Sequence, residues 1–260
     1  DIWVSVESRR ELLALVSMCA EEHWPLLIVG NGTNIVYADA GVRGIVARVN
    51  MRNYTVEDKG DGTALLLAEA GVSWPLLLHE IALLGWGGLE FGVGIPGTLG
   101  GAVISNAGAH NNELGNVLEW IEILDARGSS AAAEDEISYP MVRRLQHDQL
   151  DLSYRYSRFR ERRQFQFDDQ GGILLPARGM IEPAEIVMLL GIRLHREDSG
   201  QLQARIAEYK MHRKMTEPPA YRAGTIFKDP AGLDVDSLLT QVGMKGRTYG
   251  KAQISTSDAN

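Results

Sequence analysis

Two short stretches of this sequence carry side chains suited to acid–base or anion chemistry. In Tyr154-Arg155, the arginine could supply a fixed positive charge that stabilises a developing enolate or carboxylate. The same pair fits a surface arginine stacked on a ring equally well. In Gly224-Thr-Ile-Phe-Lys-Asp-Pro230, the Thr225 hydroxyl could transfer a proton and Lys228 could bind an anion. The spacing of this second stretch also fits an ordinary strand that starts after a turn.

A glycine-rich run from Gly92 to Gly108 could bring backbone amides close to a large ligand. Nine of the twenty-four residues from Gly85 to Gly108 are glycine, and glycine permits both close approach and positive φ. The residues between the glycines are apolar, unlike those of a flexible linker. We therefore expect a large, polar, partly aromatic cofactor here, with a cluster of turns between strands as the alternative.

A second glycine loop, Gly30-Asn-Gly-Thr-Asn34, follows a buried-type strand, as a phosphate-binding loop should. Two such loops in one chain can hold both ends of a pyrophosphate. A dinucleotide fingerprint would need a third glycine where Ile35 stands, so a Rossmann NAD site is not expected. Taken alone, the loop also fits a tight turn.

Composition narrows the class of protein. The chain has 260 residues and a net charge of -8 without a long Lys/Arg block, which argues against nucleic acid as a partner. Cys19 is the only cysteine, so we expect no disulfide, a reducing compartment and a cytoplasmic location. No apolar run reaches the roughly 18 residues of a membrane span, and we expect no membrane partner. Metal and triad motifs are absent from the sequence, so no metal is expected.

Strands and helices are interleaved along the chain. We expect strands at 3–6, 26–29, 44–49, 117–126 and 186–194, and a hairpin within 56–72. We expect helices that begin at Ser8, Ser73 and Ser199, and a short helix at 235–242. These helices are too few to cover both faces of a doubly wound sheet, which favours an α+β fold.

Four motifs, in order, resemble those of the UDP-N-acetylenolpyruvoylglucosamine reductases of bacterial peptidoglycan synthesis. The resemblance runs from about Leu26 to the chain end. Its most specific part is Gly94-Ile-Pro-Gly-Thr-Leu-Gly-Gly-Ala102 with Asn106-Ala-Gly108. The other motifs are Tyr154-Arg155 with Ser157 and Phe159, Gly224 to Pro230, and the start of a fourth at Gly246 to Asn260.

The resemblance implies an α+β fold of the two-lobed flavoprotein type. It places FAD between two small subdomains, at residues 1–50 and 51–197, and the substrate on an α+β subdomain at 198–260. It implies NADPH as co-substrate and reduction of an enolpyruvyl UDP-sugar to UDP-N-acetylmuramate. Alternatives are another FAD-dependent oxidase or dehydrogenase of this fold, or a noncatalytic nucleotide-binding module. We expect a monomer or a small homo-oligomer.

The resemblance also implies roles for residues. Arg155 would stabilise an enolate-like intermediate, Thr225 would donate the proton, and Tyr154 and Lys228 would contact the substrate. The residues expected to bind FAD are Gly30, Asn31, Gly32, Thr33, Asn34, Ile95, Pro96, Gly97, Thr98, Gly100, Gly101, Asn106 and Gly108.

The sequence departs from the family pattern at three positions. Thr225 stands where the family usually has serine, Asp229 replaces an expected asparagine, and Asp258 replaces an expected histidine. Threonine keeps the hydroxyl but restricts χ1. A catalytic glutamate of the family would fall after Asn260, so we expect the natural protein to continue. Residues 160–181 match nothing assignable.

Overall fold

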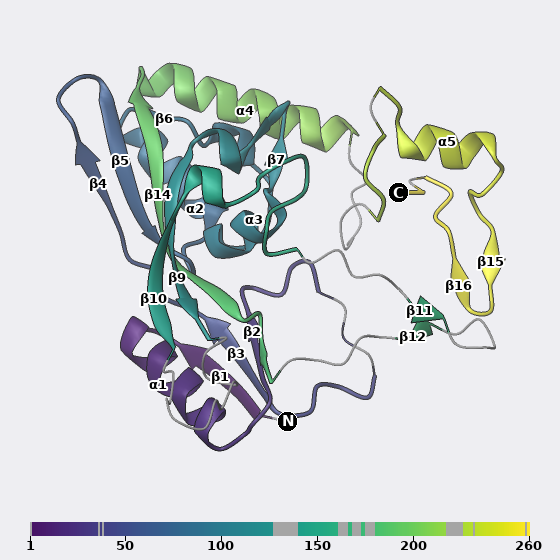
Figure 1. The fold of residues 1–260 in the computed structure, drawn as a ribbon. Coiled ribbons are helices and arrows are strands. Elements are labelled where there is room, and N and C mark those ends of the chain that lie inside the picture. The colour runs from purple at the N-terminus through teal and green to yellow at the C-terminus, as the bar shows by residue number, and fades with distance from the viewer. Residues whose placement is uncertain are drawn as a thin grey trace. The chain divides into compact units, whose positions relative to one another are not determined.

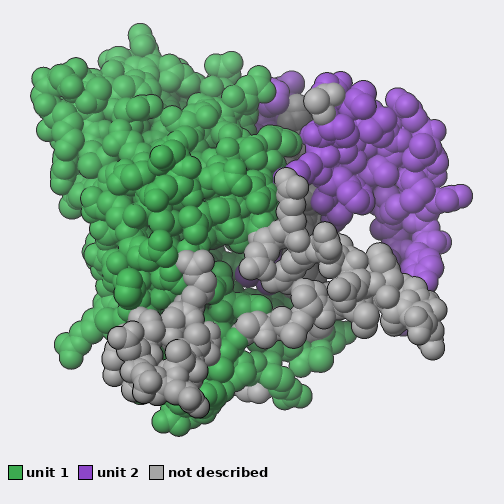
Figure 2. All heavy atoms as spheres, viewed as in Figure 1, with its two compact units in different colours: residues 1–33, 37–209 green, residues 34–36, 210–260 purple. Residues whose placement is uncertain are grey.

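The computed structural model describes residues 2–35, 37, 39–126, 140–160, 166–167, 173–174, 180–216, 226–230, 232–257 and 259–260 (Figure 1). Contacts divide the chain into a larger unit, residues 1–33 and 37–209, and a smaller unit, residues 34–36 and 210–260 (Figure 2). The division into subdomains at 1–50, 51–197 and 198–260 stays a prediction.

A small parallel sheet opens the larger unit. Its strand order is β1 (Ile2–Val6), β3 (Ile45–Val49), β2 (Leu26–Val29) and β13 (Ile181–Glu182). Ser8 is the N-cap of helix α1 (Arg9–Glu21), and its side chain accepts the Glu11 N–H. The helix therefore starts where the sequence predicted. One face of α1 buries Leu12, Val16 and Cys19, so the cysteine is a core residue.

A six-stranded antiparallel sheet forms the second part of the larger unit, and its centre is the twelve-residue strand β14. Most of β14 is buried, which fits its apolar sequence. The sheet and its covering helices, together with the parallel sheet, confirm the α+β class. Its elements are β4 (Tyr54–Asp58), β5 (Thr63–Glu69), β6 (Trp86–Gly87), β9 (Leu118–Asp125), β10 (Met141–Gln146) and β14 (Glu185–Arg196), with α2 (Trp74–Leu83) and α3 (Leu99–Ser105).

The larger unit also contains shorter elements. They are the 3₁₀ turns η1 (Glu90–Gly92), η2 (Leu114–Asn116) and η4 (His147–Gln149), and the strand pairs β7 (Gly108–Ala109) with β8 (Asn112–Glu113) and β11 (Gln166–Phe167) with β12 (Ile173–Leu174). No helix within the described residues is both long and apolar enough to span a lipid bilayer.

Glu122 on β9 links the antiparallel sheet to the helix that covers the parallel one. It accepts hydrogen bonds from Arg144 on β10, at 2.7 Å, and from Arg9 on α1. Burial raises the pKa of Glu122, but these hydrogen bonds and the two positive charges lower it overall. Its stabilising contribution is therefore present above the unfolded-state pKa and is lost as pH falls through the lowered folded-state pKa.

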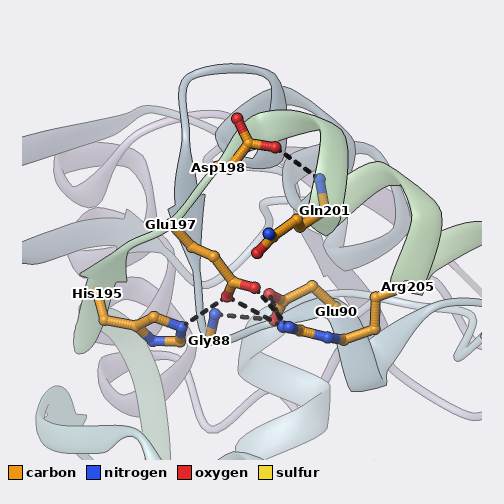
Figure 3. Close-up of polar contacts among 7 residues, drawn as sticks. All are labelled: Gly88, Glu90, His195, Glu197, Asp198, Gln201 and Arg205. Atoms are coloured by element: carbon orange, nitrogen blue, oxygen red, sulfur yellow. Dashed lines mark hydrogen bonds and ion pairs between the residues drawn. The ribbon is translucent and has the colours of Figure 1, made fainter.

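A polar cluster holds the first turns of α4 (Ser199–Thr216) against the larger unit (Figure 3). Arg205 on α4 donates to the buried Glu90 at 3.2 Å and to Glu197 at 3.1 Å, and Glu197 also lies 3.1 Å from His195 Nε2. The Arg205 hydrogen bond, with a weaker one from His195, lowers the pKa of Glu197. Glu90 also accepts the Gly88 N–H at 2.8 Å.

The same cluster brings three metal-type ligands together. The ligand atoms of Glu90, His195 and Glu197 all lie within 4.8 Å of one another. The Arg205 guanidinium donates to both carboxylates and supplies the positive charge that they need, so an ion-pair network explains this geometry. One turn further along α4, Tyr209 stacks on His110 with ring centroids 3.9 Å apart.

The smaller unit has its own polar framework. Its elements are α5 (Val235–Gln241) and the hairpin of β15 (Thr248–Tyr249) and β16 (Ala252–Gln253). Asp236 on α5 pairs with Lys245 at 2.7 Å. Asp229 accepts the Val235 N–H through Oδ1 at 3.0 Å. An asparagine would offer the same oxygen, which explains why aspartate is tolerated at position 229.

Removing the Arg205 guanidinium should destabilise the larger unit, because it leaves the buried Glu90 carboxylate without its cation. We expect Arg205→Met to lower the free energy of unfolding by about 2 kcal/mol, which corresponds to a drop of roughly 4–8 °C in Tm. This loss lies between those typical of exposed and of buried ion pairs. Thermal unfolding followed by circular dichroism measures the change. Lys210→Met, on the exposed side of the same helix, is the control and should shift Tm little. Equal shifts for both variants would contradict the role of the cluster.

Candidate active site

The two predicted glycine loops lie against each other in the larger unit. A Cβ at position 30 would lie 2.9 Å from Thr98 Oγ1, and a Cβ at position 97 would lie 2.9 Å from Thr33 Oγ1. Gly97 also has φ +112°, a region that side chains rarely adopt. The sequence therefore needs glycine at both positions to let the loops approach each other.

Within the glycine run, the structure contains a helix that the sequence did not predict. Thr98 is the N-cap of α3, and its side chain accepts the Gly101 N–H at 3.3 Å. A Cβ at position 100 would lie 2.7 Å from the Ala70 Cβ, so Gly100 allows α3 to pack on the end of β5. Two adjacent glycines disfavour a helix by propensity, and only the Thr98 cap signalled it.

The C-terminal end of α3 is bound to the Tyr154-Arg155 motif. Asn106 ends the helix with φ +43° and is 1% exposed. Its Nδ2 donates to the Ser153 carbonyl at 3.0 Å, and its Oδ1 accepts the Gly115 N–H at 2.9 Å. Ser157 donates to the Ile104 carbonyl at 2.7 Å. These bonds bring two of the sequence motifs together. A contact between Asn106 and FAD stays a prediction.

Arg155 sits at the tip of a tight turn. Ser153 and Tyr156 exchange two backbone hydrogen bonds, of 3.1 and 2.9 Å, around Tyr154 and Arg155. Arg155 has φ +54°, which is strained for a residue with a side chain and is typical of functional positions. Its guanidinium lies 5.5 Å from the centroid of the exposed Tyr154 ring.

Arg158, three residues further on, differs from Arg155 in how its charge is paired. Its Nη2 pairs with the Glu185 carboxylate on β14 at 2.9 Å, and its Nη1 donates to a backbone carbonyl. Across the described parts of the chain, no such ion pair forms at Arg155. Among the described residues, no carboxylate therefore neutralises the charge of Arg155, which fits an anion-stabilising role.

The structure places the remaining predicted site residues as follows. Gly108 is in β7, where a Cβ would lie 2.2 Å from the Asn112 carbonyl oxygen, so packing alone requires glycine there. Asn34 and Lys228 belong to the smaller unit, and Lys228 is exposed. Thr225 and Asp258 lie outside the described residues. The meeting of Arg155, Thr225 and Lys228 in one site stays a prediction.

The residues present fit the cofactor that the motifs implied. A Cβ at position 30 or 97 would crowd a threonine hydroxyl of the opposite loop, so glycine keeps the backbone of both loops free of side chains of its own there, as a diphosphate cradle needs. Sequence analysis missed a polar neighbour of this cradle: Arg48 Nη2 donates to Asn31 Oδ1 at 2.7 Å. Only the register of β2 and β3, which pairs Val29 with Arg48, could have revealed it.

Comparison with known proteins first gives the class. Residues 1–132 match the protein family described as FAD binding domain. The chain is therefore a member of a class of FAD-binding proteins.

Comparison with whole chains then gives the family. UDP-N-acetylenolpyruvoylglucosamine reductase from Rubrobacter xylanophilus is 33% identical over all of this chain and 75% of its own length. The enzyme of the same name from Caldanaerobacter subterraneus is 32% identical over 98% of this chain and 72% of its own length. The crystal structure of UDP-N-acetylenolpyruvylglucosamine reductase from Thermus caldophilus has a TM-score of 0.71 at 29% identity, over 99% of this chain and 79% of that one. The chain belongs to the UDP-N-acetylenolpyruvoylglucosamine reductase family.

A double-mutant cycle tests the contact between the two loops. Gly30→Ala should destabilise the protein by about 1–2 kcal/mol, because its Cβ crowds the capping hydroxyl, and Thr98→Ala by about 1 kcal/mol through loss of the cap. The double variant should lose about 1 kcal/mol less than the sum, because removing the hydroxyl makes room for the methyl group. Urea unfolding gives each value.

Gly32→Ala is the matched control for this cycle. A Cβ at position 32 meets nothing within 4 Å, so its effect should simply add to that of Thr98→Ala. Additivity in both cycles would mean that the two loops do not touch in solution.

Proposed function

We propose that this chain is an FAD-containing, NADPH-dependent reductase that converts an enolpyruvyl UDP-sugar, UDP-N-acetyl-3-O-(1-carboxyvinyl)glucosamine, to UDP-N-acetylmuramate for peptidoglycan synthesis. The observation that carries the proposal is the linked geometry of the glycine loops, α3 and the Arg155 turn. This geometry joins a candidate cofactor cradle to a cation that pairs with no carboxylate among the described residues. The names of the relatives support the substrate.

FAD is the proposed resident cofactor, held by the loops at Gly30–Asn34 and Ile95–Gly101. When bound, it supplies the hydride for the substrate after accepting one from NADPH. The chain itself holds the cofactor through backbone amides. Glycine-rich loops present such amides as binding sites for anionic groups. Because these loops are built on rigid elements, they also fix the position of the reacting centre.

Arg155 is the proposed electrostatic catalyst. Addition of a hydride to an enolpyruvyl ether places negative charge on a carbon conjugated with a carboxylate. A guanidinium already held in place stabilises that charge without reorganising during the reaction. The turn bonds at Ser153 and the link to Asn106 supply the required rigidity.

Thr225 is the proposed proton donor to the neighbouring carbon. A hydroxyl is a weak acid, but it can protonate a strongly basic carbanion-like centre at close range. Tyr154 and Lys228 are proposed to contact the substrate, Lys228 as a charge partner for anionic groups.

The single cysteine is consistent with a reducing compartment. We propose the cytoplasm as the location of the protein, and a monomer or small homo-oligomer as its oligomeric state.

Three absorbance measurements test the proposed function. The purified protein should absorb at about 450 nm, as oxidised flavins do when bound as cofactors. Anaerobic NADPH should bleach this band, and the enolpyruvyl UDP-sugar should restore it. Restoration by oxygen but not by the sugar nucleotide would point instead to an oxidase or dehydrogenase of the same fold. A colourless protein that binds no added FAD would contradict flavin chemistry altogether.

Loss of the Thr225 hydroxyl should affect only one half-reaction. In Thr225→Ala, NADPH should bleach the flavin band at the wild-type rate, whereas restoration by the sugar nucleotide should slow by about 10²–10⁴-fold, the typical worth of a general acid. Stopped-flow absorbance separates the two steps. Thr225→Ser keeps the hydroxyl and should restore most of the rate. Equal slowing of both steps would contradict the role of proton donor.

Two replacements of Arg155 should distinguish the effect of its charge on turnover from the effect of its backbone conformation on stability. Glycine accepts φ +54° without strain. The Arg155→Gly protein should therefore be at least as stable as Arg155→Ala, and more stable by up to about 1 kcal/mol. Turnover should nevertheless fall by about 10²–10³-fold in both variants, as after loss of one stabilising group. Steady-state kinetics, flavin content and Tm measure these effects. A colourless Arg155→Gly protein would show that the residue serves cofactor retention instead.

A further inference from the structure

Arg48 lies where the first glycine loop leaves the parallel sheet. In the β2–β3 ladder Arg48 is opposite Val29, the residue that precedes Gly30. Its Nη2 donates to Asn31 Oδ1 at 2.7 Å, so the guanidinium reaches the loop itself. An arginine on a regular strand is therefore held beside the backbone that is proposed to bind the cofactor.

The guanidinium of Arg48 is only partly satisfied by the protein. Its Nε is buried and has no hydrogen-bond partner, and within the described residues no carboxylate forms an ion pair with it. The nearby Glu7 accepts hydrogen bonds from Asn50 and Ser5 through Oε1, and the charge of Arg48 is the weakest of the influences that lower its pKa. A buried donor on a charged group is costly when it is unpaired, so this arrangement favours an anion beside Arg48.

The charge of the whole chain makes a local cation important. A net charge of -8 repels anionic ligands at long range, and the first loop contains neither lysine nor arginine. A guanidinium offers several donors in a planar fork that suits phosphate oxygens. Asn31 is neutral, so its hydrogen bond orients the fork and leaves the positive charge intact.

We propose that Arg48 binds the diphosphate of FAD, adding a side-chain cation to the backbone amides of the two loops. This inference rests on the proposed function, because it takes FAD as the occupant of the cradle. Arg48 acts here as a cofactor-binding residue and takes no part in hydride or proton transfer. The contribution is electrostatic, so it weakens as salt screens the charge.

Binding of FAD to the apoprotein tests the proposal without any turnover. Flavin fluorescence quenching gives the Kd, measured from about 50 to 500 mM salt, a range over which screening changes strongly. Arg48→Met keeps the length of the side chain and removes the charge. We expect its Kd to rise about tenfold at low salt and to depend less on salt than that of the wild type. Arg48→Lys keeps the charge and should retain the salt dependence.

Arg52→Met is the matched control, because Arg52 is an exposed arginine that follows the same strand. It changes the net charge of the protein by the same amount, and its Kd should stay within about twofold of wild type, since screened surface charges act weakly at distance. Tm values for all three variants separate loss of binding from loss of folding. If Arg48→Met unfolds, Arg48→Gln, which also removes the charge, replaces it.

Two results would overturn the proposal. One is an Arg48→Met protein that is folded and binds FAD with wild-type affinity and salt dependence. The other is an equal change of the Kd for FAD in Arg48→Met and Arg52→Met, because the effect would then come from the net charge of the protein and not from the position of Arg48. A wild-type apoprotein that binds no FAD would contradict the proposed function itself, so the two failures are distinguishable.

Discussion

The contact between Thr98 and Gly30 is the constraint on which the candidate site depends. Thr98 Oγ1 caps α3 by accepting the Gly101 N–H, and the same oxygen lies 2.9 Å from where a Cβ at position 30 would be. A larger side chain at position 30 would push the hydroxyl away from the cap. One atom therefore determines both where α3 begins and how close the two loops lie. That spacing decides whether their amides can converge on one ligand.

The other end of α3 links this placement to Arg155, the proposed catalytic arginine. Asn106 and Ser157 tie the helix to the turn that holds Arg155. A positive φ at a residue with a side chain costs about 1–2 kcal/mol. Hydrogen bonds within and beside the turn, each worth about 1 kcal/mol, offset that cost. The strained conformation can therefore persist as part of a rigid support that runs from loop to helix to turn.

Local signals in the sequence sufficed for some elements and not for others. The Ser8 cap and apolar spacing predicted α1. The glycines predicted two loops suited to a ligand, and the structure adds that these loops pack on each other. Propensity failed at α3 because Gly100 is required by packing on Ala70, which no local pattern encodes. The pairing of β13 with β2 joins residues more than 150 positions apart, so it also escaped prediction. The motifs named Arg155, but its turn geometry and its link to Asn106 needed the fold.

Three arginines near the candidate site show why residue type alone does not assign a role. Arg158 pairs with the Glu185 carboxylate, so its charge is neutralised within the protein and it supports the fold. Arg48 is held by the neutral amide of Asn31, and Arg155 lies near the ring of Tyr154. Neither of these partners is a carboxylate, and within the described part of the chain both cations therefore keep their attraction for an anion. Among these three, the partner of each guanidinium therefore distinguishes a structural arginine from one available to cofactor or substrate.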